Sequence, residues 1–425
     1  MYTCDVECSR KKKKMMRDCS EENNKIKNKG TMKRAWRDED DETDSSKQYK
    51  KLLHQKYVGI VGKPKWAKIT AKDSEKVLSN NDEDLDLLKY SGNLARTKKG
   101  VNLAKGLIGI KKLHNLNLST STCGKIVKTV EFHPTSSLAL IAGISGRASI
   151  VQVDGFNNEK LQSIKFQKFA IDCAHFTVDG KQFIAGSRTQ RNFYCYDLLE
   201  GKSMFIPVHH SIGQTKMDNF CMSPDGKLIA SSGKYGEIHL FTAKSKEWIT
   251  TLKMNGTVNA LTFNSDGKRM YSFGENGEIY EWDMNSRLCI KKFMDDGCLQ
   301  GSSLAVSGDD QYLAAGSSSG VVNLYKLPCD VNPKPEKTIL NLVTTVTKLS
   351  FNKSSDILAM ASNQKNDAVK LLHVPSKTVF SNFPTTSDNV GKVNCIDFSP
   401  NGGYLGLSNN KAEALLYRLT HFQNY

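Results

Sequence analysis

Apolar and polar residues alternate in short runs through most of the chain from about residue 127 onward. Each alternating run is followed by a polar turn, a run of small apolar residues, a second turn and an aromatic-rich run. The copy at 217–243, MDNFCMSPDGKLIASSGKYGEIHLFTA, shows this order best. A period of two is typical of half-buried β-strands and excludes solenoid helices, so the pattern predicts an all-β region.

This phrase occurs seven times, and each copy can be anchored on the residue before its first turn. The anchors are Phe132, Phe176, Met222, Phe263, Val306, Phe351 and Phe398, at intervals of 44, 46, 41, 43, 45 and 47 residues. These intervals are close to the period of about 40 to 45 residues of a four-stranded WD40 blade. The expected fold is therefore an all-β, seven-bladed WD40 β-propeller with a mostly disordered basic N-terminal extension.

The residues between the runs of each repeat predict tight turns at which the chain reverses direction. Asp-Gly and Asn-Gly supply the positive φ angles that a tight turn requires. The candidate structural WD40 residues are Asp179, Gly180, Asp225, Gly226, Asp266, Gly267, Trp282 and Asp283. The Gly-His dipeptide usual in this class is missing from every repeat. We therefore expect the blades to rely on apolar stacking rather than on a network of histidines.

The last repeat is one strand short, with predicted strands at 393–398, 404–408 and 414–419 and almost no chain after them. An open sheet edge invites aggregation, and closing the ring with a strand from the N-terminal side removes it. Residues 110–119 include the alternating sequence LHNLNL and are expected to supply that strand. The chain is thus divided into a charged disordered tail (1–49), a linker with docking motifs (50–109) and the propeller (110–425).

Positive charge is concentrated in the N-terminal region. Residues 1–112 contain 28 Lys and Arg against 17 Asp and Glu, which is +11 of the chain's net +16. The basic run consists of Arg10, Lys11, Lys12, Lys13, Lys14 and Arg17. It suits nuclear import or contact with nucleic-acid phosphates, although a merely solvated lysine run is the alternative. An acidic block at 38–44 precedes Ser45 and Ser46, and it fits either a phosphorylation site or a solubilising tract.

A short motif with a tryptophan lies between the charged tail and the repeats. It consists of Pro64, Lys65, Trp66 and Ala67. Exposing a tryptophan in a disordered segment is costly, so the motif is a candidate for docking on a partner or on the propeller. The alternative is an incidental aromatic residue in a tail.

Composition narrows the cellular setting. The eleven cysteines contain no CxxC pair and most lie in apolar strand contexts, which favours an intracellular, reducing environment. The first residues lack the apolar core of a signal peptide, and no run approaches the length of a membrane span. We expect a soluble protein with no membrane partner.

Several patterns resemble active sites but lack the required context. Ser318 lies in a GxSxG sequence that is expected to join two strands, whereas a nucleophile elbow joins a strand to a helix. Residues 59–63 end like a phosphate-binding loop, but Pro64 replaces the hydroxyl residue. His209 and His210 lack further metal ligands at a suitable spacing. His133, His175 and His239 are expected to be packed or hydrogen-bonded residues. We expect no catalytic residues, cofactor, metal or small-molecule substrate.

Longer phrases are more specific than the generic turn sequences. They occupy 64–67 (PKWA), 91–94 (SGNL), 130–143 (VEFHPTSSLALIAG), 223–230, 262–274, 278–283 (EIYEWD) and 320–325 (GVVNLY). Through them the chain from about Leu52 onward resembles the U3 small nucleolar RNA-associated protein 18 family, WD40 subunits of the small-subunit processome. The resemblance implies a nuclear, nucleolar location and a role in early 18S rRNA processing. It also implies U3 snoRNA, precursor rRNA and other WD40 subunits as partners.

Two other functions remain open, and one feature of the family is not matched. Some members carry a Leu-Phe-x-x-Asp motif that recruits an exosome-associated helicase, and no such sequence occurs before Tyr90. Helicase recruitment is therefore not implied. The first alternative function is a substrate-recruiting adaptor of a ubiquitin-ligase or chromatin complex. The second is a propeller enzyme, which would need acids and histidines that converge at the propeller axis, and the sequence suggests no such set.

Overall fold

The computed structural model describes residues 46–61, 103–118, 124, 126–208, 215–385, 388–422 and 425. The chain divides into two compact units, Met1–Arg96 and Thr97–Tyr425, which are treated separately. In the first unit the described element is the helix α2 (Ser46–Val61). It runs across the expected boundary at residues 49 and 50, where no helix was predicted. Leu53 and Tyr57 on this helix are exposed.

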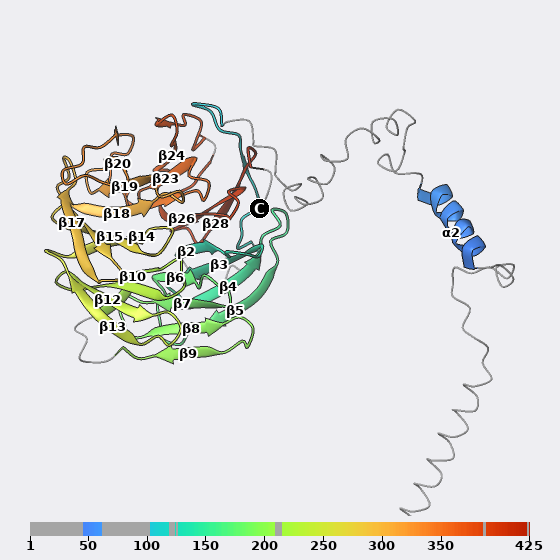
Figure 1. Ribbon diagram of the computed structural model, residues 1–425, viewed down its shortest axis with the longest axis horizontal. Helices are drawn as coiled ribbons and strands as arrows, with labels where there is room; N and C mark the ends of the chain where they lie inside the picture. Colours follow the sequence, from blue (N-terminus) through green and yellow to red (C-terminus); the bar gives the residue numbers. More distant parts are fainter. Residues whose placement is uncertain are drawn as a thin grey trace, which may run out of the picture. The chain divides into compact units, whose positions relative to one another are not determined.

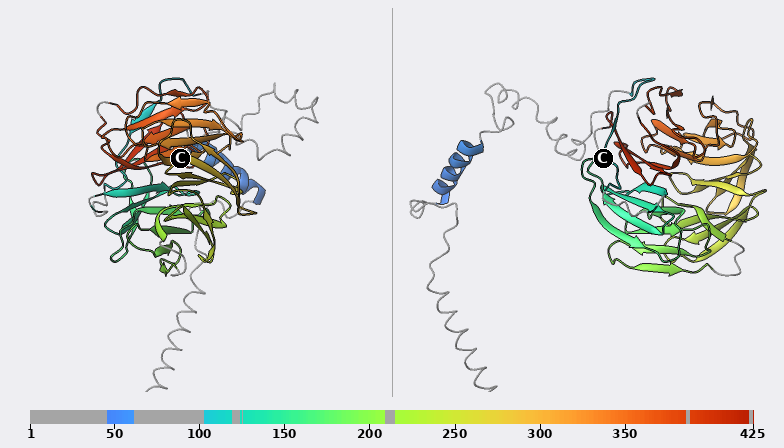
Figure 2. Two further views of the ribbon diagram at one scale, coloured as in Figure 1. Left: turned by 90° about the vertical axis from the view of Figure 1, so that its left-hand side faces the viewer. Right: turned by 180° about the vertical axis from the view of Figure 1, so that it is seen from behind.

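The second unit is a ring of seven antiparallel four-stranded sheets, or blades (Figures 1 and 2). Blade 1 consists of β2 (Val127–Phe132), β3 (Leu138–Gly143), β4 (Arg147–Gln152) and β5 (Lys160–Lys165). Blade 2 consists of β6 (Cys173–Phe176), β7 (Gln182–Gly186), β8 (Phe193–Asp197) and β9 (Ser203–Ile206). Blade 3 consists of β10 (Thr215–Met222), β11 (Leu228–Gly233), β12 (Glu237–Thr242) and β13 (Trp248–Lys253).

The ring continues with the same order of strands in three further blades. Blade 4 consists of β14 (Val258–Phe263), β15 (Arg269–Gly274), β16 (Glu278–Asp283) and β17 (Leu288–Met294). Blade 5 consists of β18 (Gly301–Val306), β19 (Tyr312–Ser317), β20 (Val322–Lys326) and β21 (Lys337–Ile339). Blade 6 consists of β22 (Lys348–Phe351), β23 (Ile357–Ala361), β24 (Val369–His373) and β25 (Thr378–Val379). The predicted all-β, seven-bladed propeller is confirmed.

Blade 7 is built from both ends of the propeller unit. Its first three strands are β26 (Val393–Phe398), β27 (Tyr404–Asn409) and β28 (Ala414–Leu419), and its fourth is β1 (Ile110–Lys112). β1 pairs antiparallel with β28, and Ile110 lies opposite Leu419. The backbone N–H of Leu113 and that of Leu116 extend the contact by donating to the carbonyls of Leu416 and Ala414. Residues within 110–119 therefore cover the edge that β28 would otherwise expose.

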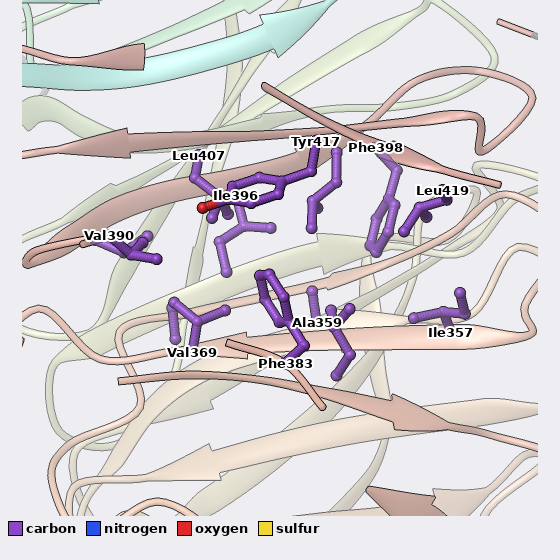
Figure 3. Packing of buried hydrophobic residues seen from close by; sticks show 14 of the residues in the cluster. Ile357, Ala359, Val369, Phe383, Val390, Ile396, Phe398, Leu407, Tyr417 and Leu419 are labelled. Carbon is purple, nitrogen blue, oxygen red and sulfur yellow. The ribbon is translucent and has the colours of Figure 1, made fainter. Parts of the chain in front are cut away.

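Apolar side chains fill each of the seven interfaces between neighbouring blades with a separate buried cluster. Figure 3 shows the cluster between blades 6 and 7, where the rings of Phe383 and Tyr417 meet edge to face at 5.4 Å. Ile108, from the segment before β1, belongs to the same cluster. The segment that closes the ring is thus also part of the core.

The first strand of each blade lies at the axis of the ring. Each of these strands contacts the first strand of the next blade, and β26 contacts β2 to complete the circle (Figure 1). Their side chains therefore face one another across blade boundaries. This inner circle is where residues one repeat apart in the sequence meet.

Candidate interaction platform

The first turns of several neighbouring blades are joined by hydrogen bonds. His133 Nδ1 accepts a hydrogen bond from the backbone N–H of Ser136 at 2.9 Å, which leaves Nε2–H to donate to the carbonyl of Gly180 at 2.8 Å. Gly180 has a φ of 68°, and a Cβ there would come within 2.3 Å of the His133 ring. A histidine thus ties blade 1 to blade 2. The expectation that histidines play no part in linking the turns is wrong at this position.

Two other pairs of turns are joined by smaller polar groups. Between blades 4 and 5 the backbone N–H of Ser265 donates to the Asp310 carboxylate at 2.9 Å. Between blades 5 and 6 the backbone N–H of Asp309 donates to Ser355 Oγ at 3.0 Å. Serine and aspartate therefore do for these turns what His133 does between blades 1 and 2. These hydrogen bonds fix the relative positions of the turns that they join.

Trp282 and Asp283 hold the end of β16. Trp282 Nε1 donates to Ser272 Oγ at 2.9 Å, and the indole stacks on the ring of Tyr280. Asp283 accepts hydrogen bonds from Ser286 Oγ and from the backbone N–H groups of Asn285 and Ser286. These hydrogen bonds, that from the Ser286 hydroxyl first, lower the pKa of Asp283. The Trp-Asp dipeptide is therefore structural in this blade.

The remaining candidate turn residues play smaller parts. Gly226 and Gly267 have φ angles of 69° and 70°, as expected for tight turns. Asp179 is exposed, and Asp266 is an exposed partner of Lys268 at 3.7 Å. An exposed ion pair of this length contributes little to stability. These two aspartates are therefore free to face a partner.

A ring of polar side chains joins the inner strands near the start of each repeat. We call Asn219, Asn259, Ser302 and Asn394 the inner polar ring. Each donates a side-chain hydrogen bond to a backbone carbonyl of the next blade, the acceptors being Asn259, Gly301, Val346 and Val127. Three of the four lie four residues before an anchor, a position at which no functional residue was predicted. This spacing was a usable signal, because the inner edge of a first strand leaves carbonyls without a strand partner.

Ionisable side chains replace neutral ones on the inner strands of blades 7, 1 and 2. Asp397 accepts from the backbone N–H of Phe132 at 2.8 Å, and Glu131 accepts from that of Phe176 at 3.3 Å. Glu131 also lies 3.0 Å from His175 Nδ1. All three residues immediately precede an anchor. The expectation that no acids and histidines converge at the axis is therefore wrong, because residues 44 apart become neighbours across a blade boundary.

The protein environment shifts the pKa values of two of these groups, Asp397 and His175. Burial and the nearby Glu131 charge raise the pKa of Asp397 to about 8. Burial disfavours the His175 cation, yet the charges of Cys173 and Glu131 outweigh it and raise the His175 pKa well above its usual value. Opposite charges stabilise one another most where water is scarce. The inner strands of blades 7, 1 and 2 therefore add a cluster of ionisable side chains to the neutral groups of the inner polar ring.

The outer edge of blade 4 offers an apolar surface. β17 is the outermost strand and pairs only with β16 in the described structure. Leu288, Ile290 and Met294 on it are exposed. An exposed strand edge with apolar side chains is typical of a site where another protein binds.

Several candidate residues of the sequence analysis have no described structure. The basic run at 10–17, the motif at 64–67 and the His209–His210 pair lie outside the described residues. Ser318 is described, and it lies in the turn between β19 and β20. Within the described ranges, no cluster of three or more His, Cys, Asp or Glu residues is arranged to hold a metal ion. No described helix has both the length and the apolar character needed to cross a membrane.

Comparison with protein families matches residues 246–283 to the WD40 family (WD domain, G-beta repeat). The matched segment runs from two residues before β13 to the end of β16, so it includes the Trp282–Asp283 dipeptide. The WD40 match thus agrees with the observed sheets.

Comparison with curated proteins gives relatives that extend over most of the chain. It is 40% identical over 382 residues to the human U3 small nucleolar RNA-associated protein 18 homolog, an alignment that covers 88% of this chain and 68% of the relative. It is 44% identical to the mouse homolog, with 80% of this chain and 62% of the relative covered. It is 35% identical to the Drosophila melanogaster homolog, with 92% and 81% covered. The chain spans about two thirds of the length of these mammalian relatives.

Proposed function

The chain belongs to the U3 small nucleolar RNA-associated protein 18 family, and we propose on this basis that it is a non-catalytic WD40 scaffold of the nucleolar small-subunit processome. It acts in early 18S precursor-rRNA processing and in assembly of the small ribosomal subunit. The observation that carries this proposal is the 35% identity to the Drosophila relative, over 92% of this chain and 81% of the relative. The names of these relatives state association with U3 small nucleolar RNA.

A scaffold needs a rigid body with several independent surfaces, and the propeller supplies both. The turns are fixed by bonds such as that between His133 and Gly180, so their positions are set before a partner binds. The edge of β17 offers a separate, apolar surface to another WD40 subunit or a neighbouring protein. Preorganised surfaces bind without a large ordering cost.

The basic run at 10–17 is proposed to direct nuclear and nucleolar accumulation and to contact U3 snoRNA or precursor rRNA. Its six positive charges are suited to phosphate groups, and such contacts weaken as salt rises. The motif at Pro64–Ala67 is proposed as a docking segment for a processome partner. In this proposal the basic run binds RNA, whereas the motif at Pro64–Ala67 and the propeller bind proteins.

Precipitation of the tagged chain from nuclear extract tests the proposal. We expect U3 snoRNA to be enriched and the tagged protein to be nucleolar. Replacing the six basic residues at 10–17 with glutamine should reduce both, whereas a matched replacement of lysines 160 and 165 on β5 should reduce neither. Precipitates without U3 snoRNA would contradict the proposal.

The same experiment distinguishes the proposed scaffold function from the alternative, an adaptor of a ubiquitin-ligase or chromatin complex. An adaptor would be nucleoplasmic or cytoplasmic, and its precipitates would be indifferent to ribonuclease. Family membership does not favour that function.

A further inference from the structure

Three side chains on two neighbouring inner strands form a continuous line of hydrogen bonds. Cys173 Sγ lies 3.1 Å from His175 Nε2, and His175 Nδ1 lies 3.0 Å from Glu131 Oε2. Cys173 and His175 are two residues apart on β6, so their side chains share one face of the strand. Glu131 reaches them from β2 of the adjacent blade. The order thiol, imidazole, carboxylate is the one by which proteins activate a cysteine.

The imidazole is fixed in one orientation. The Glu131 carboxylate is itself held by the backbone N–H of Phe176, and the His175 ring packs edge to face on Phe220 at 5.0 Å. Because a carboxylate only accepts, Nδ1–H of His175 must donate to Glu131. Nε2 is then left to take the proton of the Cys173 thiol. The geometry thus favours a thiolate beside an imidazolium.

The charged groups around the thiol come from five inner strands. Glu131 lies on β2, Cys221 on β10, Lys348 on β22, and both Cys395 and Asp397 on β26, in addition to His175 on β6. Burial opposes ionisation of Cys173, but the positive charges of His175 and Lys348 outweigh burial and lower the pKa of this thiol. For both Cys221 and Cys395, burial dominates and raises the pKa. The three inner-strand thiols therefore differ in their readiness to ionise.

We propose that Cys173 is a nucleophilic modification site at the propeller axis, activated by His175 and Glu131, and that it takes small electrophiles of the hydroperoxide class. With hydrogen peroxide, the thiolate sulfur attacks one oxygen and the O–O bond breaks. Sulfur is oxidised by two electrons to the sulfenic acid, and the peroxide is reduced. The leaving hydroxide takes the proton from His175 and departs as water.

The burial of Cys173 sets a size limit on its reagents. Only 6% of the residue is exposed, whereas the His175 side chain is 31% exposed. We therefore expect a small reagent to reach the thiol more readily than a bulky one. Cys289 on β17 is an internal reference. The residue as a whole is exposed, and partial burial of its thiol raises its pKa, in contrast to the lowered pKa of Cys173.

Peptide mass spectrometry on the full, folded chain tests the proposal. The iodoacetamide labelling rate of Cys173 should rise less steeply between pH 6 and pH 8 than that of Cys289, because the pKa of Cys173 is lowered and that of Cys289 is raised. A polyethylene glycol maleimide should reverse the preference and label Cys289 first. Hydrogen peroxide followed by dimedone should mark Cys173 as the sulfenic acid. Absence of labelling at Cys173, or a pH profile parallel to that of Cys289, would overturn the proposal.

Two variants test whether His175 and Glu131 activate the Cys173 thiol or only lie close to it. His175→Asn should slow labelling of Cys173 at pH 6.5 at least tenfold and restore an ordinary pH profile, and Glu131→Gln should have a smaller effect in the same direction. His421→Asn, at a histidine beyond the last strand, should change neither cysteine. An unchanged Cys173 rate in folded His175→Asn would refute activation. If that variant does not fold, the pH profile of the unmodified chain still decides.

Discussion

The first strands of the blades form an inner circle, and two arcs of this circle join neighbouring blades through different kinds of side chain. In the charged arc, on β26, β2 and β6, the residue before each anchor is Asp397, Glu131 or His175. In the neutral arc, on β14 and β18, it is Thr262 or Ala305. In the charged arc, two carboxylates accept from backbone N–H groups of the next blade. In the neutral arc, Asn259 and Ser302 join the blades without a carboxylate, whereas in the charged arc the amide of Asn394 does so alongside Asp397.

The difference shows that a blade interface does not need ionisable groups. Amides and hydroxyls satisfy the backbone without any dependence on pH, whereas a carboxylate adds a desolvation cost that must be offset by its partners. The charged arc therefore has a desolvation cost and a pH dependence that the neutral arc lacks. A chemical role for part of the charged arc would account for this cost. The two arcs can be distinguished by how substitutions in each change stability.

The largest effect is expected at β1, the outermost strand of blade 7, whose innermost strand β26 belongs to the charged arc. Deleting residues 1–118 removes β1 and also Ile108 and Leu116, which are buried in two interblade clusters. Loss of even one such side chain costs about 2–5 kcal/mol, so the free energy of unfolding should fall by at least that much. Deleting residues 1–96 removes no part of the propeller unit and is the control. Equal melting temperatures for the two truncations would show that β1 does not stabilise the ring.

A smaller effect is expected from Glu131 itself. Glu131→Ala removes the acceptor for the Phe176 N–H and the partner of His175, and leaving such groups unpaired costs about 1–3 kcal/mol. Thr262→Ala, at the same position in the neutral arc, should cost less than about 1 kcal/mol, because its hydroxyl makes only a 3.5 Å contact with the Phe263 carbonyl. Chemical denaturation measures both. Equal losses would remove the distinction between the arcs.

The pH dependence of stability should also come from the charged arc. The pKa of Asp397 is raised to about 8, so between about pH 4 and pH 8 the folded state holds a proton that the unfolded state has released. The contribution of Asp397 to the free energy of unfolding is therefore greatest at low pH and falls as pH rises through this window. Asp397→Asn keeps an acceptor for Phe132 and should flatten this part of the profile, gaining on the unmodified chain as pH approaches 8. Parallel pH profiles for the two proteins would contradict the assignment.

The sequence predicted the blades well because their signals are local. Alternation, Asp-Gly turns and the missing strand of the last repeat each depend on neighbouring residues, and the bounds of β26 and β28 agree with the predicted strands. The charged arc was missed because Glu131 and His175 meet across a blade boundary. Aligning the residues that precede the anchors would have placed these two in neighbouring blades. It would not have shown the 3.1 Å approach of Cys173 to His175, which depends on side-chain rotamers.

The smallest effect is expected at Trp282, on the third strand of a neutral-arc blade. Trp282→Phe keeps an aromatic ring beside Tyr280 but loses the hydrogen bond to Ser272, which is worth about 1 kcal/mol. Because neither the indole N–H nor the serine hydroxyl titrates, the loss should be the same at pH 4 and pH 8. In a double-mutant cycle with Ser272→Ala, the two losses should overlap by roughly the value of that bond. A pH-dependent loss at Trp282 would mean that ionisable groups influence the neutral arc as well, and the pH behaviour of the ring could then no longer be assigned to Asp397 and its neighbours.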